Sequence, residues 1–139
     1  MKTLIISSFT LTLIIFTFSS CNHISESGDI GDKFYSYLQQ ENYDAIILLL
    51  DTEALKNYTK DEWKEMLSAR NQYFGRLESY KPIGFHTETQ ENYKIIKLDY
   101  RVSNSNGQVF EEIKLINRDK QIKILNYHFP SDVALADKK

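Results

Sequence analysis

The spacing of apolar residues changes twice along this chain. From residue 4 to residue 16 the stretch LIISSFTLTLIIF carries no charge. From residue 29 to residue 75 apolar side chains return every three or four positions, which is the period of an α-helix. From residue 81 onward apolar and polar residues alternate, which is the period of a β-strand. The pattern therefore predicts an apolar leader, then helices, then strands.

Three helices are predicted from this pattern. The first runs from Asp29 to about Gln40. The apolar residues that share one of its faces are Ile30, Phe34, Tyr37 and Leu38. The second helix covers the unbroken apolar run at residues 45–50. Periodicity alone also allows a buried strand there, and we interpret the run as a helix.

The third predicted helix has the clearest signals at its ends. Thr59 and Glu62 match the capping box, in which each side chain bonds to the backbone N–H of the other residue. Gly75 suits the position after the last turn, where a left-handed conformation is common. The residues on helical spacing between these ends are Trp63, Met66, Leu67, Arg70 and Phe74.

The strands are predicted over residues 81–88, 93–102, 108–116 and 121–129. The turn sequences NSNG at residues 104–107 and NRDK at residues 117–120 predict tight hairpins between the last three strands. Helices followed by an antiparallel meander predict an α+β domain, in which N-terminal helices pack against a four-stranded sheet.

Alternation assigns each strand residue to one face of the sheet. The inner residues of the second strand are Ile96, Leu98, Tyr100 and Val102. On the third strand the same rule places Glu111 on the inner face, among apolar neighbours. A carboxylate there must find a partner or raise its pKa, so Glu111 is a candidate general base with Tyr100 as a candidate donor. A place at the rim, or a bulge that turns Glu111 outward, is the plainer alternative.

The fourth strand has apolar residues on both faces. Alternation puts His128 on the same face as Ile124 and puts Tyr127 on the opposite face. His128 is therefore a third candidate pocket residue. Together with Phe110 on the outer side of the third strand, this pattern predicts that the outer face is covered, either by a second copy of the chain in a homodimer or by the tail 131–139. A strand buried on both faces explains the pattern equally well.

Composition excludes some functions without defining one. The chain has 139 residues, a length typical of one domain, with 26% charged residues and a net charge of −2. This balance gives no reason to expect nucleic acid as a partner. The three histidines are far apart, and the sequence has no phosphate-binding glycine loop and no Ser-His-Asp or Cys-His arrangement. We therefore predict no metal and no cofactor, and we assign no catalytic motif.

The leader ends at the only cysteine of the chain. Its start is positively charged, its apolar run is too short to span a bilayer, and the small residues Ser19 and Ser20 precede Cys21. The stretch from Phe18 to Cys21 resembles the lipobox of bacterial lipoproteins. The resemblance implies that Cys21 carries lipid, that the protein is exported and anchored to the bacterial cell envelope, and, from Asn22 after the cysteine, that the anchor lies in the outer membrane. An incidental thiol beside an ordinary cleavage site is the alternative.

The order of the predicted elements resembles the nuclear-transport-factor-2-like superfamily. The stretches that carry the resemblance are YDAIILLL, WKEMLSARNQYFG and IKILNYHF. The resemblance implies a cone-shaped, cystatin-like domain in which a curved sheet wraps helices. Ketosteroid isomerases of this superfamily use an Asp base and a Tyr donor, and neither maps onto a matched motif here. The predicted parts of the chain are a signal peptide (1–20), a polar tether (21–28), the α+β domain (29–130) and a C-terminal tail (131–139).

Three functional hypotheses follow. The first is a non-enzymatic, membrane-anchored accessory domain that binds a small apolar ligand or an envelope protein, because anchoring raises the effective concentration of a binding surface near its partner. The second is a small cone-pocket enzyme of isomerase or hydrolase type with Glu111 as base and Tyr100 as donor. The third is an immunity or exclusion lipoprotein that acts against a toxin or phage.

Overall fold

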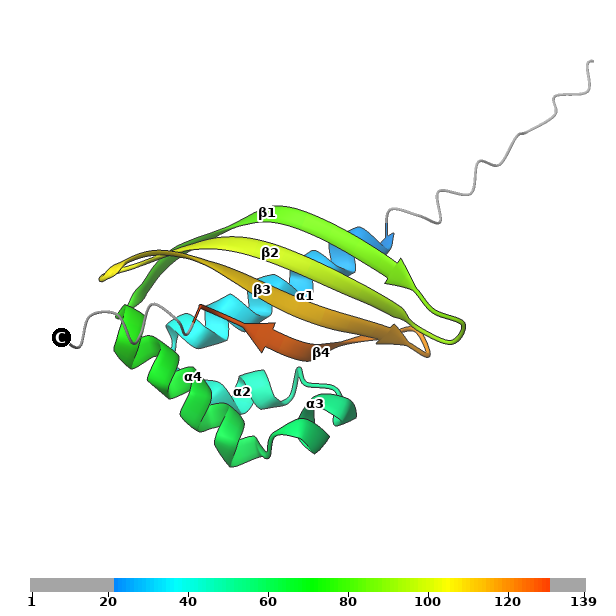
Figure 1. Cartoon of the computed structure of the whole chain (residues 1–139), viewed down its shortest axis with the longest axis horizontal. Coiled ribbons are helices and arrows are strands. Elements are labelled where there is room, and N and C mark those ends of the chain that lie inside the picture. Colours follow the sequence, from blue (N-terminus) through cyan, green and yellow to red (C-terminus); the bar gives the residue numbers. More distant parts are fainter. Residues whose placement is uncertain (1–21, 131–139) are drawn as a thin grey trace, which may run out of the picture.

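Helices fill the first half of the described chain and strands fill the second (Figure 1). The computed structural model describes residues 22–130, with side chains from Ser25 onward. The predicted signal peptide, Cys21 and the tail 131–139 lie outside the described residues. The helices are α1 (Asn22–Gln39), α2 (Tyr43–Ile47), α3 (Thr52–Asn57) and α4 (Lys60–Phe74). The strands are β1 (Leu77–Thr89), β2 (Lys94–Asn104), β3 (Gly107–Arg118) and β4 (Gln121–His128).

The strands form one antiparallel sheet in the order β1-β2-β3-β4, so each strand pairs with its neighbour in sequence. The sheet is curved, and the helices lie on its concave side, which we call the inner face (Figure 1). Irregular pairing occurs between Pro82 and Gly84 in β1 and at Leu125 in β4. Such bulges bend and twist a strand. The predicted α+β fold, with helices packed against a curved four-stranded antiparallel sheet, is confirmed.

Both predicted turn sequences form tight hairpins. Asn104 pairs with Gly107, so two residues connect β2 to β3. Between β3 and β4, Asp119 and Lys120 have φ angles of 53° and 61°. Two consecutive residues with positive φ are typical of a type I′ turn, whose twist matches that of the paired strands.

Helix α4 begins and ends as predicted. The backbone N–H of Glu62 donates to the Thr59 hydroxyl at 3.3 Å, and the backbone N–H of Thr59 donates to the Glu62 carboxylate at 2.7 Å. These two bonds are the reciprocal capping box. Gly75 ends the helix with a φ of 81°, a conformation that favours glycine because it has no Cβ.

Helix α1 begins earlier than predicted. The first helix was predicted to begin at Asp29, but residues 22–28 of the predicted polar tether are helical too, so the predicted start is wrong. Ser27 and Gly31 are both buried and lie on the face that also carries Phe34, Tyr35 and Leu38. A small polar residue and a glycine do not count as apolar, and the sequence pattern therefore missed the first turns of the helix.

The apolar run at residues 45–50 contains both structures that its periodicity allowed. Helix α2 covers only the first part of the run, and Leu50 forms a parallel bridge with Ile124 of β4. The backbone N–H of Asp51 donates to the Ile124 carbonyl at 2.7 Å, and the Ile124 N–H donates to the Leu49 carbonyl at 2.8 Å. The prediction of a helix is therefore confirmed for the part of the run that lies in α2 and is wrong for the rest. Helix α3, which follows, was not predicted.

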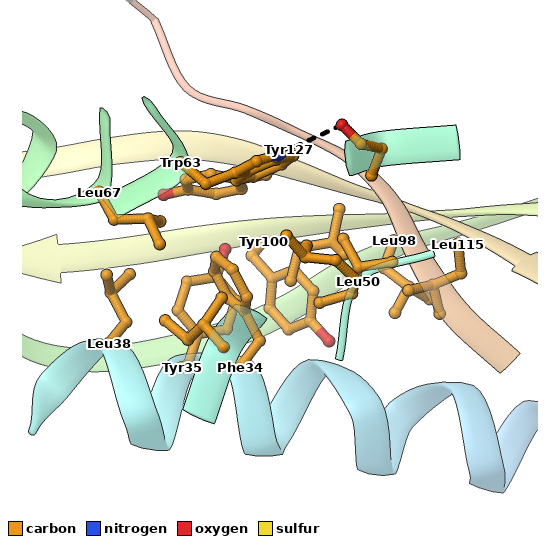
Figure 2. Close-up of a cluster of buried hydrophobic side chains, with 14 of the residues drawn as sticks. Phe34, Tyr35, Leu38, Leu50, Trp63, Leu67, Leu98, Tyr100, Leu115 and Tyr127 are labelled. Atoms are coloured by element: carbon orange, nitrogen blue, oxygen red, sulfur yellow. Dashed lines mark hydrogen bonds between the residues drawn. The ribbon is translucent and has the colours of Figure 1, made fainter. Parts of the chain in front are cut away.

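The hydrophobic core lies between α1 and the inner face of the sheet. Phe34, Tyr35 and Leu38 point from α1 toward the strands, where Tyr100 and Leu98 meet them (Figure 2). The predicted inner residues of β2 are all buried, as are Ile113 and Leu115 of β3. The core therefore fixes the inner face of the sheet as the sequence predicted, with one exception in β4 that is described below.

We predict that alanine has opposite effects at the two glycines of α1. A Cβ on Gly31 would overlap the hydroxyl oxygen of Tyr100, whereas a Cβ on Gly28 meets no described atom within 4 Å. Gly31→Ala should lower the free energy of unfolding by about 1–3 kcal/mol through overpacking. Gly28→Ala should raise it by about 0.5–1 kcal/mol because alanine favours a helix. Urea denaturation of both variants measures the effects, and equal stability of the two would contradict this account of the contact.

Candidate functional site

A bulge in β4 exchanges two of its side chains between the faces of the sheet. Lys114 pairs with Asn126, but the next residue of β3, Leu115, pairs with Ile124, which leaves Leu125 without a partner in the ladder. Alternation restarts after this extra residue, so Tyr127 is buried on the inner face. The predicted faces of β4 are therefore wrong beyond the bulge.

His128 consequently lies outside the predicted pocket. Its side chain is exposed on the outer face, opposite Glu112 of β3. It lines a small hollow of about 280 Å³, and Ile83, Phe110 and Glu111 belong to the same lining. Of the three candidate pocket residues, Glu111 and Tyr100 are buried on the inner face, whereas His128 is exposed.

Glu111 is the centre of a fully buried polar cluster that we call the inner cluster: Tyr35, Arg70, Glu111 and Tyr127. The Arg70 guanidinium donates to Glu111 Oε1 from Nη2 at 2.6 Å and from Nε at 3.0 Å. The hydroxyls of Tyr35 and Tyr127 donate to Oε2 at 3.0 Å and 2.8 Å. Both carboxylate oxygens are thus occupied by two donors each, and neither side chain of the ion pair is exposed. The partner that a buried carboxylate requires is Arg70.

The electrostatics of the cluster keep its tyrosines protonated. Burial raises the pKa of Tyr127 well above the ordinary value of 10.0, and the charge of Glu111 raises it further. The pKa of Tyr35 is also raised well above 10.0, first by burial and then by the nearby Tyr127 and Glu111. Both hydroxyls therefore remain hydrogen-bond donors to Glu111 across the physiological pH range.

Tyr100 faces the cluster without joining it. It pairs with Glu111 across β2 and β3, yet within the described residues no hydrogen bond connects the two side chains. Burial raises its pKa, with a further contribution from Asp32. The ring lies 4.7 Å from that of Tyr35, centroid to centroid, and the hydroxyl sits against Gly31. The structure brings the two predicted residues close together but gives Tyr100 a packing role beside Glu111.

Sequence reasoning missed three members of the cluster, although one had a signal. Arg70 falls on the apolar stripe of the third predicted helix, and a cation there needs an anionic partner just as Glu111 needs a cation. The two misfits could have been paired with each other. Tyr35 and Tyr127 offered no such signal, because tyrosine is common at half-buried positions and the bulge before Tyr127 is not visible in the sequence.

A second feature is a groove of about 770 Å³ on the other side of the sheet. One wall comes from α3 and the start of α4, and the other comes from outer-face residues of the strands. Figure 1 shows α3 and α4 beside the edge strand β4. We call this groove the outer groove. Its lining residues are Glu53, Ala54, Asn57, Tyr58 and Trp63 from the helical side and Tyr93, Ile95, Lys114, Ile116, Arg118, Leu125 and Asn126 from the strand side. Its volume lies in the range of small-molecule sites, about 300–1,000 Å³.

Two further observations concern metal ions and membrane-spanning helices. In the part of the chain that the structure describes, no three His, Cys, Asp or Glu side chains gather closely enough to hold a metal ion. Within the same residues, no helix has the length and apolar character needed to cross a membrane.

We predict that the ion pair of the inner cluster is needed for stability. Arg70→Met leaves the Glu111 carboxylate buried without its cation, which should lower the free energy of unfolding by about 3–5 kcal/mol. The matched control is Lys64→Met, which removes an ion pair with Asp44 whose carboxylate side chain is largely exposed and should leave the melting temperature nearly unchanged. The double variant Arg70→Met with Glu111→Leu should recover part of the loss, because no unpaired charge remains. A double variant no more stable than Arg70→Met would argue against this explanation.

We also predict a loss of stability at alkaline pH that the cluster tyrosines cause. Their pKa values lie well above 10.0 in the folded protein, so above about pH 10 the unfolded chain releases protons that the folded chain retains. The contribution of these tyrosines to the free energy of unfolding should therefore be constant below about pH 10 and fall as the pH rises beyond it. Tyr127→Phe should reduce that slope by up to about 1.4 kcal/mol per pH unit. Urea denaturation at a series of alkaline pH values measures the slope, and a wild-type slope in both Tyr127→Phe and Tyr35→Phe would refute the assignment.

Comparison with solved structures shows which known fold this domain resembles. No protein-family model matches this chain, and no curated protein matches it. Among solved structures it is similar to a candidate NTF2-like transpeptidase from Campylobacter jejuni, with a TM-score of 0.53 and 14% identity, over 70% of this chain and 95% of that one. It is also similar to a candidate ketosteroid isomerase from Shewanella frigidimarina, with a TM-score of 0.51 and 17% identity, over 75% of this chain and 94% of that one. The described domain thus has the NTF2-like fold that the sequence predicted.

Proposed function

We propose that this protein is a non-enzymatic binding domain that is anchored to a bacterial envelope by lipid on Cys21. The observation that carries the first half of the proposal is the closure of the inner cluster. A general base must come within hydrogen-bond reach of the proton that it removes from a substrate. The Glu111 side chain is 0% exposed, and both of its oxygens already accept bonds from Arg70, Tyr35 and Tyr127.

Aromatic rings also pack tightly around the Glu111 side chain on the inner face. The rings of Phe34, Tyr35 and Tyr100 fill the space between α1 and the sheet on this side (Figure 2). A substrate could reach the carboxylate only by displacing a tyrosine or the arginine, and each of these displacements would leave a buried polar group without its partner. A binding function on the outer surface requires no such rearrangement.

The anchoring half of the proposal is supported by the leader and by the start of the fold. The apolar leader ends in Ser19, Ser20 and Cys21, and α1 begins at the next residue, Asn22. A lipid on Cys21 would therefore hold the domain directly at the membrane surface, without an intervening flexible segment. Anchoring at this distance concentrates a binding surface near envelope partners or lipids. Asn22 after the cysteine is our reason to propose the outer membrane.

A homodimer through the outer face is part of the same proposal. Phe110 is 60% exposed and Ile83 is 46% exposed on this face, away from the outer groove. The guanidinium of Arg101 lies 5.7 Å from the centre of the Phe110 ring. An exposed aromatic with a cation beside it is a common anchor of protein interfaces, and a two-fold axis would place two such anchors against each other.

The enzymatic alternative rests on the likeness to the candidate ketosteroid isomerase and on the buried Glu111 with its tyrosine donors. An assay of the purified protein with a ketosteroid separates the two proposals. No turnover is expected from a domain whose carboxylate is closed off. Turnover by the wild type that is lost in a folded Glu111→Gln variant would replace the binding proposal with the enzymatic one.

We predict that Cys21 is required for attachment to the membrane. Cys21→Ala cannot form the thioether to lipid, so the protein should move from the membrane fraction to the soluble or secreted fraction. Mass spectrometry of the wild-type N-terminal peptide should show acyl chains on Cys21. The matched control is Ser19→Ala, which keeps a small residue in the leader and should remain in the membrane fraction. Full retention of Cys21→Ala at the membrane is the result that speaks against the anchor.

A further inference from the structure

We propose that the outer groove binds a small anionic amphiphile, a molecule with an apolar tail and one negatively charged carboxylate or phosphate head. This inference rests on the proposed binding function and names its ligand class. The groove is separate from the inner cluster, since it lies on the opposite face of the sheet and contains none of the four cluster residues.

The shape and walls of the groove suit an apolar tail. Ile95 and Ile116 pair across β2 and β3 on the outer face, and Leu125, which the bulge of β4 turns out of the ladder, joins them in the lining. Two aromatic rings border this apolar floor. Tyr58 is 51% exposed and Tyr93 is 39% exposed, so both have apolar surface available for a ligand.

The charge of the groove suits an anionic head. Lys114 and Arg118 belong to the lining, and Lys97 lies directly opposite Lys114 on the neighbouring strand. Like charges facing each other across two strands destabilise a sheet, so an anion bound at Lys114 would reduce this repulsion. Within the described residues neither Lys97 nor Lys114 forms an ion pair.

One carboxylate, Glu53, also belongs to the lining, and its pKa is lowered by Lys56 and, to a smaller extent, by the charge of Arg118. Glu53 is bonded by Lys56 of the same helix at 2.7 Å. The guanidinium of Arg118 lies 5.9 Å from the centre of the Tyr93 ring, which holds the cation at the edge of the aromatic wall. The apolar floor, the exposed aromatic walls and the two cations together define an amphiphile site, in which the tail lies on the isoleucines and the head meets Lys114 and Arg118.

The chain contains its own reporter for this site. Trp63 is the single tryptophan of the sequence, and it is buried in the groove lining next to Tyr58. The experiment uses the full chain bearing Cys21→Ala, so that no attached lipid competes with the probes. Tryptophan fluorescence is followed during titration with dodecanoate, and we expect a saturable change.

Matched probes test separately how the charged head and the apolar tail of the ligand contribute to binding. Dodecanol has the same tail without the charge, dodecylammonium has the opposite charge, and acetate has the head without the tail. Dodecanol should bind more weakly than dodecanoate, and dodecylammonium and acetate should cause no saturable change. Equal binding of dodecanoate and dodecanol would overturn the proposed role of the cations, and no saturable response to dodecanoate would overturn the site.

Matched variants locate the binding. Lys114→Gln combined with Arg118→Gln should weaken dodecanoate binding by about tenfold or more, because two charged partners of the head are lost. The control Lys81→Gln makes the same change of charge on β1, at the far edge of the sheet, and should bind like the parent. Ile116→Asp places a carboxylate on the apolar floor and should abolish binding. Circular dichroism confirms that each variant is folded, and parent-like affinity in the double variant would refute the proposal.

The source of the head group is distinguished with vesicles of phosphatidylglycerol. If the protein binds dodecanoate but not the vesicles, the ligand of the groove is a free amphiphile. If it binds the vesicles and this binding requires Lys114 and Arg118, the ligand is a lipid head group of the membrane beside the anchor. The failure of this inference can be separated from the failure of the proposed function. If dodecanoate does not bind the groove and the protein does not turn over a ketosteroid, only the proposed ligand class is rejected. If the protein turns over a ketosteroid and this activity depends on Glu111, the proposed binding function is rejected.

Discussion

The ion pair between Arg70 and Glu111 is the constraint on which the rest of this structure depends. Burying an isolated charge costs far more free energy than a domain of this size can spare, so each of these residues requires the other. The pair connects α4 to β3, and its remaining bonds reach Tyr35 on α1 and Tyr127 on β4. A single carboxylate therefore fixes how two helices sit against two strands. Apolar packing alone would tolerate small slips of these elements, but four directed bonds to one group do not.

The same constraint closes the interior of the domain around Glu111. A curved sheet that wraps helices can leave an open cavity on its inner face, and in this chain the aromatic rings and the inner cluster occupy that space. Stability and an accessible inner carboxylate are in conflict here, because the bonds that make Glu111 tolerable in the core also close it to solvent. The outer groove, which is lined by apolar residues of β2 and β3 and by the aromatic residue Tyr58, contains none of the cluster residues.

The outer groove depends on two local irregularities in the fold. The bulge at Leu125 turns one apolar side chain out of the β4 ladder, and the bridge between Leu50 and Ile124 holds the start of α3 beside that strand. A regular β4 would place Tyr127 on the outer face, and the inner cluster would lose a donor. The groove and the closed interior are thus two consequences of one extra residue. A lipid anchor on Cys21, immediately before α1, would keep this surface within reach of the membrane.

The sequence by itself determined that helices precede the strands. It also determined the capped ends of α4, the two hairpins and the inner residues of β2 and β3, because periods, caps and turns are properties of neighbouring residues. It also marked Glu111 as a misfit that needs a partner. Only the tertiary structure decided that this partner is Arg70, that Leu50 pairs with Ile124, and that Tyr127 rather than His128 faces inward. Contacts between residues far apart in the chain, and a bulge that forms in response to packing, leave no periodic trace in the sequence.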